Sequence, residues 1–208
     1  MIKKENFFCP HYHNAWEHPN CWNKYGDVSN ISTVYFDIET NGLQADFNNL
    51  LTYSFKVANK NEYITGTIKK SELRYQGDKR LVEEICHVLH TFDRVVTYYG
   101  SRFDLPFIRT KALEYGIDFP SNREVQQIDL WQTARRKLKL HSNRLISVCD
   151  ILGIKGKSSV QPVLWRKANF GDLNALNAIL KHNMNDVMVL EKVHKRLEEH
   201  VGYTRSSI

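Results

Sequence analysis

The order of strand-like and helix-like segments constrains the fold of this chain more than any other feature. Segments rich in β-branched and aromatic residues predict five strands, at Thr33–Ile38, Leu50–Val57, Glu62–Ile68, Arg94–Tyr98 and Val125–Ile128. Helices are predicted at Lys79–Thr91, Asp104–Tyr115, Leu130–Lys137, Asn143–Leu152, Asp172–Leu180 and His182–His200, the last two either kinked or continuous, whereas residues 153–170 are typical of a loop. Hairpin strands followed by alternating helices and strands predict an α/β fold, with a mixed five-stranded sheet flanked by helices.

The length of 208 residues suits one domain preceded by a short segment. We divide the chain into a Cys/His-rich N-terminal segment, residues 1–30, and a domain over residues 31–208. A composition of 42% hydrophobic and 25% charged residues excludes a disordered or collagen-like chain. The sequence has neither an apolar run of about 18 residues nor an apolar stretch behind its basic start, so we expect no membrane partner and a cytoplasmic location.

The net charge of +6 is unevenly distributed along the chain. Residues 130–170 contain nine basic residues against one acidic residue, and the basic ones are Arg135, Arg136, Lys137, Lys139, Arg144, Lys155, Lys157, Arg166 and Lys167. Such a stretch predicts one positive surface for a polyanion such as nucleic acid. A solvated surface with scattered basic side chains explains the charge equally well.

Acidic residues follow two of the predicted strands. Asp37 and Glu39 lie two positions apart at the carboxyl end of the first strand, so the alternation of a strand places them on one face. Asp104 follows the strand Arg94–Tyr98 and stands four residues after Gly100, which permits a tight turn. Because Mg²⁺ and Mn²⁺ prefer carboxylate oxygens, these acids predict a divalent metal site.

The last predicted helix adds a further acid and a histidine. His182 and Asp186 are four residues apart, which places them on one helical face. Four carboxylates can hold two metal ions about 3.5–4 Å apart, the arrangement that stabilises both reacting oxygens in phosphoryl displacement. Histidine, with an ordinary pKa of about 6.5, suits proton abstraction near neutral pH, so we assign His182 as the general base.

Three segments around these acids resemble the motifs of a known family. The segments YFDIET, YYGSRFDLPFI and HNMNDVMVL resemble, in this order, the three exonuclease motifs of the DEDD superfamily, which has a ribonuclease H-like fold. The resemblance covers roughly residues 32–198. It implies that Asp37 and Glu39 belong to the first motif, Asp104 to the second and Asp186 to the third. It also implies hydrolysis from a 3′ end, assisted by two metal ions, with release of nucleoside monophosphates.

The third motif departs from both subclasses of that superfamily. The tyrosine subclass places a tyrosine four residues before the last aspartate, and the histidine subclass places a histidine five residues before it. Here His182 stands four residues before Asp186. The resemblance is closest to predicted exonucleases whose third motif reads Tyr-Asn-x-x-Asp-Val.

Residues around the motifs are candidates for binding the substrate. The resemblance implies that Leu43 wedges against the terminal bases and that Asp129 matches a recurring aspartate outside the metal quartet. We expect substrate contacts from Thr40, Leu43, Arg102, Phe103, Asn143 and Arg144.

The leading hypothesis is a metal-dependent 3′–5′ exonuclease that prefers single strands, with DNA favoured over RNA. Electrostatic tracking of the backbone and stacking of terminal bases would make binding tolerant of sequence. One alternative is a non-catalytic nucleic-acid-binding module on the same fold. Another is a proofreading subunit acting with a separate polymerase. The sequence identifies no other protein partner.

The N-terminal segment contains a second candidate metal site. Five zinc-type ligands fall within 13 residues, and they are Cys9, His11, His13, His18 and Cys21. Tetrahedral zinc takes two cysteines and two histidines readily, and a metal would let so short a segment fold. We expect both cysteines and two of the three histidines to bind a structural Zn²⁺. The alternative is a loop docked by Trp16 and Trp22 with coincidental histidines.

Overall fold

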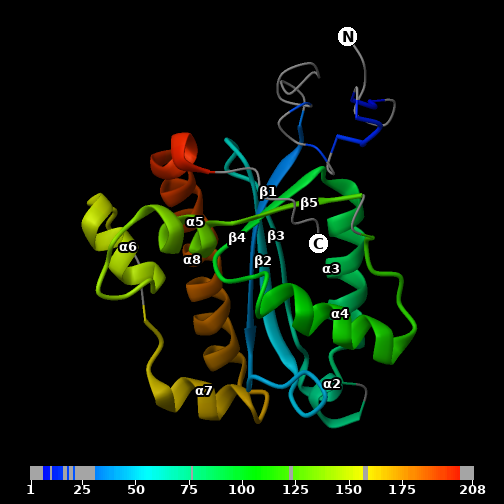
Figure 1. Ribbon diagram of the computed structural model, residues 1–208. Coiled ribbons are helices and arrows are strands. Elements are labelled where there is room, and N and C mark those ends of the chain that lie inside the picture. The colour runs from blue at the N-terminus through cyan, green and yellow to red at the C-terminus, as the bar shows by residue number, and fades with distance from the viewer. Residues whose placement is uncertain are drawn as a thin grey trace.

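A mixed five-stranded sheet forms the centre of the molecule (Figure 1). The computed structural model describes residues 7–9, 11–15, 18, 21, 31–75, 77–121, 124–156 and 159–201. The strands lie in the order β3 (Tyr63–Thr67), β2 (Leu50–Val57), β1 (Thr33–Thr40), β4 (Arg94–Thr97) and β5 (Gln126–Asp129). β1, β2 and β3 are antiparallel neighbours, whereas β4 and β5 run parallel to β1. The carboxyl ends of β1, β4 and β5 therefore meet at one edge of the sheet.

Helices cover both faces of this sheet, as the sequence predicts. They are α2 (Lys70–Tyr75), α3 (Lys79–Thr91), α4 (Asp104–Tyr115), α5 (Leu130–Lys137), α6 (Leu145–Leu152), α7 (Pro162–Ala168) and α8 (Leu173–Leu197), followed by the short 3₁₀ helix η2 (Glu198–His200). Figure 1 shows α3 and α4 on one side of the strands and α5, α6 and α8 on the other. The predicted mixed α/β fold is confirmed.

Two apolar clusters fix the helices to the two faces. Alternation along β1 sends Val34, Phe36 and Ile38 into a cluster with α3 and α4. Tyr35 points the other way, into a cluster with α5, α6 and the carboxyl-terminal half of α8. Asp37 and Glu39 lie two and four residues after Tyr35, on the same face of β1. The strand therefore directs these acids toward the face that α8 covers.

Polar contacts hold α8 against the sheet. Lys56 on β2 and Glu191 on α8 form an ion pair in which the side chains are only 7% and 10% exposed. Burial raises the pKa of the Glu191 carboxyl, but hydrogen bonds from Lys56 and from the Asn59 N–H outweigh burial and hold it below its ordinary value. Near the end of the same helix, His194 Nδ1 lies 2.9 Å from the hydroxyl oxygen of Tyr35. These contacts set the position of α8 relative to β1.

The structure differs from the sequence-based expectation in two segments and decides between two alternatives in a third. The stretch 153–170 is not all loop, because α7 occupies Pro162–Ala168. Helix α2, six residues long, lies in a stretch where we predict no helix. The two predicted helices at the carboxyl end form the single helix α8, as one of our two alternatives states.

The short helices have a physical explanation. Pro162 begins α7 at a position where its missing N–H is not needed, while Leu164, Trp165 and Ala168 pack against the first apolar cluster. Such packing stabilises a helix of two turns or fewer, which is too short to show a periodic pattern of apolar residues.

In the described residues, no helix combines the length and apolar character that crossing a membrane would require.

Candidate active site at the carboxyl end of β1

The first two acids are presented by the end of β1. Asp37 and Glu39 lie opposite Ser54 and Thr52 of β2, and the pairing of these strands shifts between Glu39 and Thr40. An irregularity of this kind bends a strand and redirects its side chains. Immediately afterwards, the Thr40 hydroxyl donates a hydrogen bond to the carbonyl of Gly42 at 2.6 Å, which starts the loop 41–49.

Asp104 reaches the same strand from the start of α4. Its Oδ1 accepts a hydrogen bond from the backbone N–H of Ile38, between the two acids of β1, at 3.1 Å. The residue is 4% exposed. Burial raises the pKa of Asp104 to about 7, and the negative charge of Asp129 adds to this rise, while backbone hydrogen bonds oppose it. A nearby cation would therefore stabilise the charged form strongly.

Helix α8 closes the site from the other side. Asn183 is fully buried, and its Nδ2 donates a hydrogen bond to Asp37 Oδ2 at 2.5 Å, while the Thr52 hydroxyl donates to Asn183 Oδ1 at 3.4 Å. His182 lies between the other acids, with Nε2 3.6 Å from Glu39 Oε1 and Nδ1 3.9 Å from Asp186 Oδ1. The structure thus brings together Asp37, Glu39, Asp104, His182 and Asp186.

The donor set of this site suits hard divalent cations. Its four acidic residues offer oxygen ligands, and two of them, Asp104 and Asp186, are 4% and 8% exposed. Burying several anions beside one another is unfavourable unless a cation compensates them. Mg²⁺ and Mn²⁺ bind such oxygens, so the residues fit the metals that the sequence motifs imply.

Asp129, at the end of β5, organises the turn that delivers Asp104. Its carboxylate accepts hydrogen bonds from the N–H groups of Tyr99 at 2.8 Å and Ser101 at 3.1 Å, and from the Ser101 hydroxyl. It also accepts from the N–H of Trp131, capping α5. Tyr99 adopts a left-handed backbone with φ of 68°, which costs free energy in a non-glycine residue. Asp129 therefore holds a turn that would otherwise relax.

Three of the candidate substrate residues, Thr40, Leu43 and Phe103, lie close to the acids in the chain. Leu43 is 76% exposed on the loop after β1, and Phe47 on the same loop is 85% exposed. Phe103 is half-buried, packs against the first apolar cluster and immediately precedes Asp104. Thr40 and Phe103 thus lie next to the acids in the chain, and Leu43 presents an exposed apolar side chain on the loop that follows β1.

An aromatic and basic cluster follows the turn that carries Asp104. The Trp131 ring lies 4.9 Å from the Tyr99 ring, centre to centre, in an edge-to-face arrangement. The guanidinium groups of Arg102 and Arg135 lie 5.8 and 5.1 Å from the centre of the Trp131 ring. The sequence predicts a substrate contact for Arg102 but not for Trp131 or Tyr99, whose proximity depends on the turn that Asp129 holds.

Asn143 and Arg144 lie at a pocket beside this cluster. The pocket has a volume of about 560 Å³, and its lining includes Tyr99, Trp131, Asn143 and Arg144. The Asn143 carbonyl accepts a hydrogen bond from the Tyr98 hydroxyl at 2.6 Å, while its side-chain Oδ1 is buried with no hydrogen-bond partner. Arg144 is exposed and directly precedes α6.

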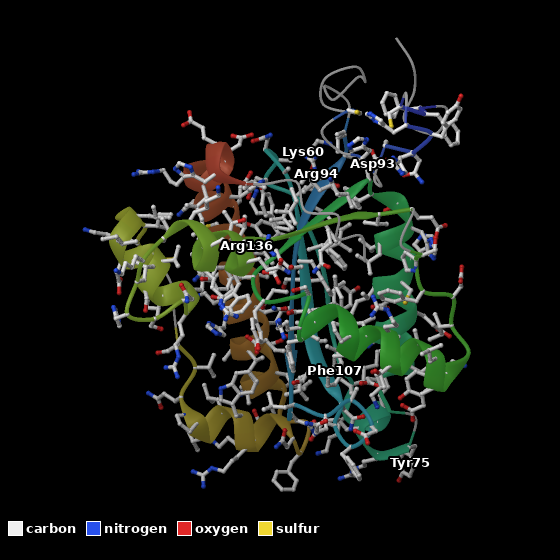
Figure 2. The ribbon with its side chains drawn as sticks, viewed as in Figure 1. Lys60, Tyr75, Asp93, Arg94, Phe107 and Arg136 are labelled. Atoms are coloured by element: carbon white, nitrogen blue, oxygen red, sulfur yellow. The ribbon has the colours of Figure 1, made fainter. Side chains whose placement is uncertain are left out.

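The basic stretch forms one flank of the molecule. Figure 1 shows α5, α6 and α7, which lie in this stretch, along one side, and Figure 2 labels Arg136 on α5. Every described basic residue of the stretch is exposed, and Lys157 lies outside the described residues. A second pocket, of about 540 Å³, lies where the segment before and within α7 meets α8, and His182 contributes to its wall.

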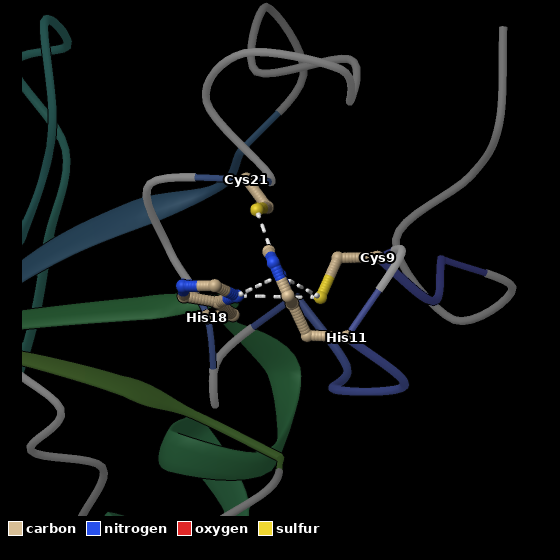
Figure 3. A group of neighbouring side chains, drawn as sticks. All are labelled: Cys9, His11, His18 and Cys21. Carbon is tan, nitrogen blue, oxygen red and sulfur yellow. Dashed lines mark hydrogen bonds between the residues drawn. The ribbon is translucent and has the colours of Figure 1, made fainter.

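The N-terminal segment brings together a different kind of ligand. The donor atoms of Cys9, His11, His18 and Cys21 all lie within 4.8 Å of one another (Figure 3). In the described part of the chain, this is the one group of three or more potential ligands that is so close; the acids of the sheet edge are spaced more widely. His13 lies outside the group, and Trp16 and Trp22, the alternative anchors, lie outside the described residues.

Comparison with known proteins agrees with this architecture. A model of the RNase_H superfamily matches residues 34–198. The solved family B DNA polymerase from the hyperthermophilic archaeon Pyrobaculum calidifontis is similar to 81% of this chain, with a TM-score of 0.66 and 14% identity, over 24% of its own chain. At this identity the similarity shows the fold alone.

Sequence relatives are also polymerases. A DNA polymerase of Methanocaldococcus jannaschii is 28% identical over 100 residues, covering 38% of this chain. A DNA polymerase III PolC-type of Halalkalibacterium halodurans is 24% identical over 196 residues, covering 80% of this chain. The chain spans only 6% and 13% of the lengths of these two relatives.

Proposed function

The chain belongs to the RNase H superfamily, and from that premise we propose that it is a metal-dependent 3′–5′ exonuclease that hydrolyses phosphodiester bonds, preferably in single-stranded DNA. The observation that carries the proposal is the convergence of Asp37, Glu39, Asp104 and Asp186 with His182 at one end of β1. A non-catalytic binding module has no need of buried carboxylates at this place. Superfamily membership supports nuclease chemistry in general. The 3′–5′ direction and the preference for single-stranded DNA are part of what we propose.

The four acids would hold two Mg²⁺ or Mn²⁺ ions. When bound, such a pair stabilises the charge on the attacking and leaving oxygens of the phosphate. The chain's own part is to fix the ligands before substrate arrives. Asn183 orients Asp37 through a hydrogen bond, and the Ile38 N–H orients Asp104. Asp129 keeps the turn before Asp104 in place.

His182 is the proposed general base. Its ring faces both Glu39 and Asp186 and also borders the pocket between α7 and α8, so it lies between the acids and a space that solvent and substrate can enter. It would accept the proton of the attacking water. The tyrosine subclass has a hydroxyl-bearing side chain at the same spacing, so this register can serve a water-orienting group.

Replacing His182 by alanine is expected to lower kcat by about 10²–10⁴-fold, the range in which a general base contributes. Because the acids stay in place, KM for an oligonucleotide should change little. Added imidazole should restore part of the lost rate in His182→Ala, but none in Asp186→Asn. A His182→Ala enzyme with wild-type kcat would remove His182 from the mechanism.

The strand leading to the 3′ end would cross the aromatic and basic cluster. Trp131 and Tyr99 would stack with bases, while Arg102, Arg135 and Arg144 would contact phosphates; the proximity of these side chains supports this path. Asn143 Oδ1, buried at the pocket wall without a partner, can accept a hydrogen bond from a base. Leu43, on the loop after β1, and Phe103, directly before Asp104, would pack against the terminal nucleotide. Thr40 and its bond to Gly42 would hold the loop that carries Leu43.

Replacing Trp131 by alanine is expected to raise KM for single-stranded DNA about tenfold or more, because stacking of one base contributes about 1–3 kcal/mol. The chemical step should be nearly unaffected, so kcat should change less than threefold. Trp131→Phe, which keeps a stacking surface, is the matched control and should stay close to the wild-type KM. Equal KM values for the wild-type protein, Trp131→Ala and Trp131→Phe would show that the DNA strand does not contact Trp131. The readout is steady-state kinetics with a fluorescent oligonucleotide.

The proposal is tested by offering linear and covalently closed circular single strands of the same sequence, with Mg²⁺ or Mn²⁺. An exonuclease should degrade the linear strand and leave the circle intact. Parallel DNA and RNA strands measure the preference between sugars. Cleavage of the circle would show an endonuclease, and binding without cleavage of either would favour a non-catalytic module.

A proofreading role with a separate polymerase is the second candidate. The observation that favours it is that the two relatives and the similar solved structure are all DNA polymerases. A proofreading nuclease should remove a mismatched 3′ nucleotide from a primer–template duplex faster than a paired one. Equal rates would favour an exonuclease of unpaired strands that acts alone.

A further inference from the structure

We propose that the N-terminal segment is a zinc module in which Cys9, His11, His18 and Cys21 bind one Zn²⁺, while His13 does not. This site is separate from the acids of the sheet edge and does not depend on the proposed function.

The distances between donor atoms fit a tetrahedral ion. With Zn–S of about 2.3 Å and Zn–N of about 2.0–2.1 Å, a regular tetrahedron separates sulfur from nitrogen by about 3.5 Å and nitrogen from nitrogen by about 3.3 Å. Cys9 Sγ lies 3.7 Å from His11 Nδ1 and 3.3 Å from His18 Nδ1. Cys21 Sγ lies 3.8 Å from His11 Nδ1, and the two histidine Nδ1 atoms are 3.2 Å apart. The ring nitrogens that face the thiols in Figure 3 are thus the expected ligands.

Backbone turns present the ligands in two pairs. The N–H of Cys9 bonds to the carbonyl of His13, and the N–H of Tyr12 bonds to the carbonyl of Cys9, so the backbone turns back on itself at Cys9 and His11. The N–H of Cys21 bonds to the carbonyl of His18, which forms the second turn. Two short turns that each offer one thiol and one imidazole resemble a preformed chelate.

His13 is the histidine that this geometry leaves out. Its Nδ1 lies 4.0 Å from Cys9 Sγ, the longest of the three histidine distances to that sulfur, and it does not join the close group. His13 takes part in the loop through its backbone carbonyl, which accepts the Cys9 N–H. The sequence does not tell which two of the three histidines would bind the metal. The loop conformation favours His11 and His18 over His13.

The place of the module indicates a structural role. Phe7, Cys9 and Ala15 form a small apolar cluster, against which Cys21 and Ile31 pack. Ile31 precedes β1, and six extended residues at about 3.3 Å each separate it from Asp37 by about 20 Å. Figure 2 shows Asp93 and Arg94 at the end of the sheet near this segment, and Phe107 of α4 nearer the other end. A cluster of three buried residues is too small to stabilise a fold, so the metal would supply the missing free energy.

Binding would release the protons of the two thiols to solvent, because thiolates are the zinc ligands. Two sulfur and two nitrogen donors select zinc over the hard ions that suit the acidic site. The two sites should therefore fill independently, with Mg²⁺ unable to displace the zinc.

The test is the metal content of the full chain, purified without added metal and measured by plasma mass spectrometry. We expect one Zn²⁺ per wild-type chain, retained in excess Mg²⁺. His18→Ala and Cys21→Ser should each lose this zinc, whereas the matched control His13→Ala should retain it. Far-UV circular dichroism of each variant checks that the sheet domain is folded.

Cobalt provides a second measurement that needs no ligand variant to fold. Co²⁺ is added to wild-type protein from which a chelator has removed the metal. It should give the intense visible bands of tetrahedral coordination and a sulfur-to-cobalt charge-transfer band, both unchanged in His13→Ala. A wild-type chain that holds no zinc and takes up neither Zn²⁺ nor Co²⁺ would overturn the proposal. Loss of metal from His13→Ala would overturn the ligand set.

Discussion

The Asp186→Asn protein is expected to hydrolyse nucleic acid at least ~10³-fold more slowly than the wild-type protein at saturating Mg²⁺. Asparagine keeps the shape of the side chain but removes a negative charge that would hold a divalent ion beside the reacting phosphate. Removing one preorganised electrostatic contact of this kind costs about 10²–10³-fold in kcat, and losing a metal ligand costs more. The measurement is the initial rate on a single-stranded oligonucleotide over a range of Mg²⁺ concentrations.

The fold of this variant should not suffer. Asp186 is 8% exposed and lies near other acids, so in a chelating buffer the substitution removes like-charge repulsion. Its free energy of unfolding should therefore equal or exceed that of the wild-type protein. Asp150→Asn, the same change at an exposed position of α6, is the matched control and should keep the wild-type rate. An Asp186→Asn protein with more than a tenth of the wild-type rate would refute the metal assignment.

The second large effect is expected on stability. Glu191→Leu should lower the free energy of unfolding by about 3–5 kcal/mol, because Lys56 would stay buried without its counter-charge. The Asn59 N–H would also lose its acceptor, which bonds to it at 2.8 Å in the wild-type protein. The measurement is urea unfolding followed by circular dichroism.

Two further variants separate the buried charge from other causes. The double variant Lys56→Met with Glu191→Leu should recover most of the loss, because both charges leave the interior together. Glu83→Leu removes one partner of the exposed pair Lys79–Glu83 and should cost about 0.5 kcal/mol or less. A Glu191→Leu loss no larger than that of Glu83→Leu would show that the ion pair does not hold α8 to the sheet.

Much of the architecture can be predicted from local sequence. The bounds of β2, α3, α4 and α5 agree with prediction because apolar periodicity, turns and caps all act within a few residues. Helix α7 escapes prediction because its stability comes from packing against the first apolar cluster and against α8 rather than from a repeated pattern. Tertiary contacts outweigh propensity in such short elements.

The candidate site divides in the same way. Strand alternation is enough to place Asp37 and Glu39 together, and helical spacing is enough for His182 and Asp186. Asn183 could not be assigned, because its contact with Asp37 depends on how α8 is rotated against β1. Trp131 could not be assigned either, because it meets Tyr99 only through the turn that Asp129 holds. In both cases the decisive contact joins segments far apart in the chain.

The roles of the acids, of His182 and of the Cys/His group remain predictions, and one measurement bears most directly on the central one. A single-stranded oligonucleotide labelled at its 5′ end is incubated with the protein and Mg²⁺, and samples are resolved by length over time, with a chelator control and Asp186→Asn alongside. We expect a ladder that shortens progressively from the 3′ end, only with metal and only in the wild-type protein. Immediate release of the labelled 5′ nucleotide, or an intact strand despite tight binding, would contradict it.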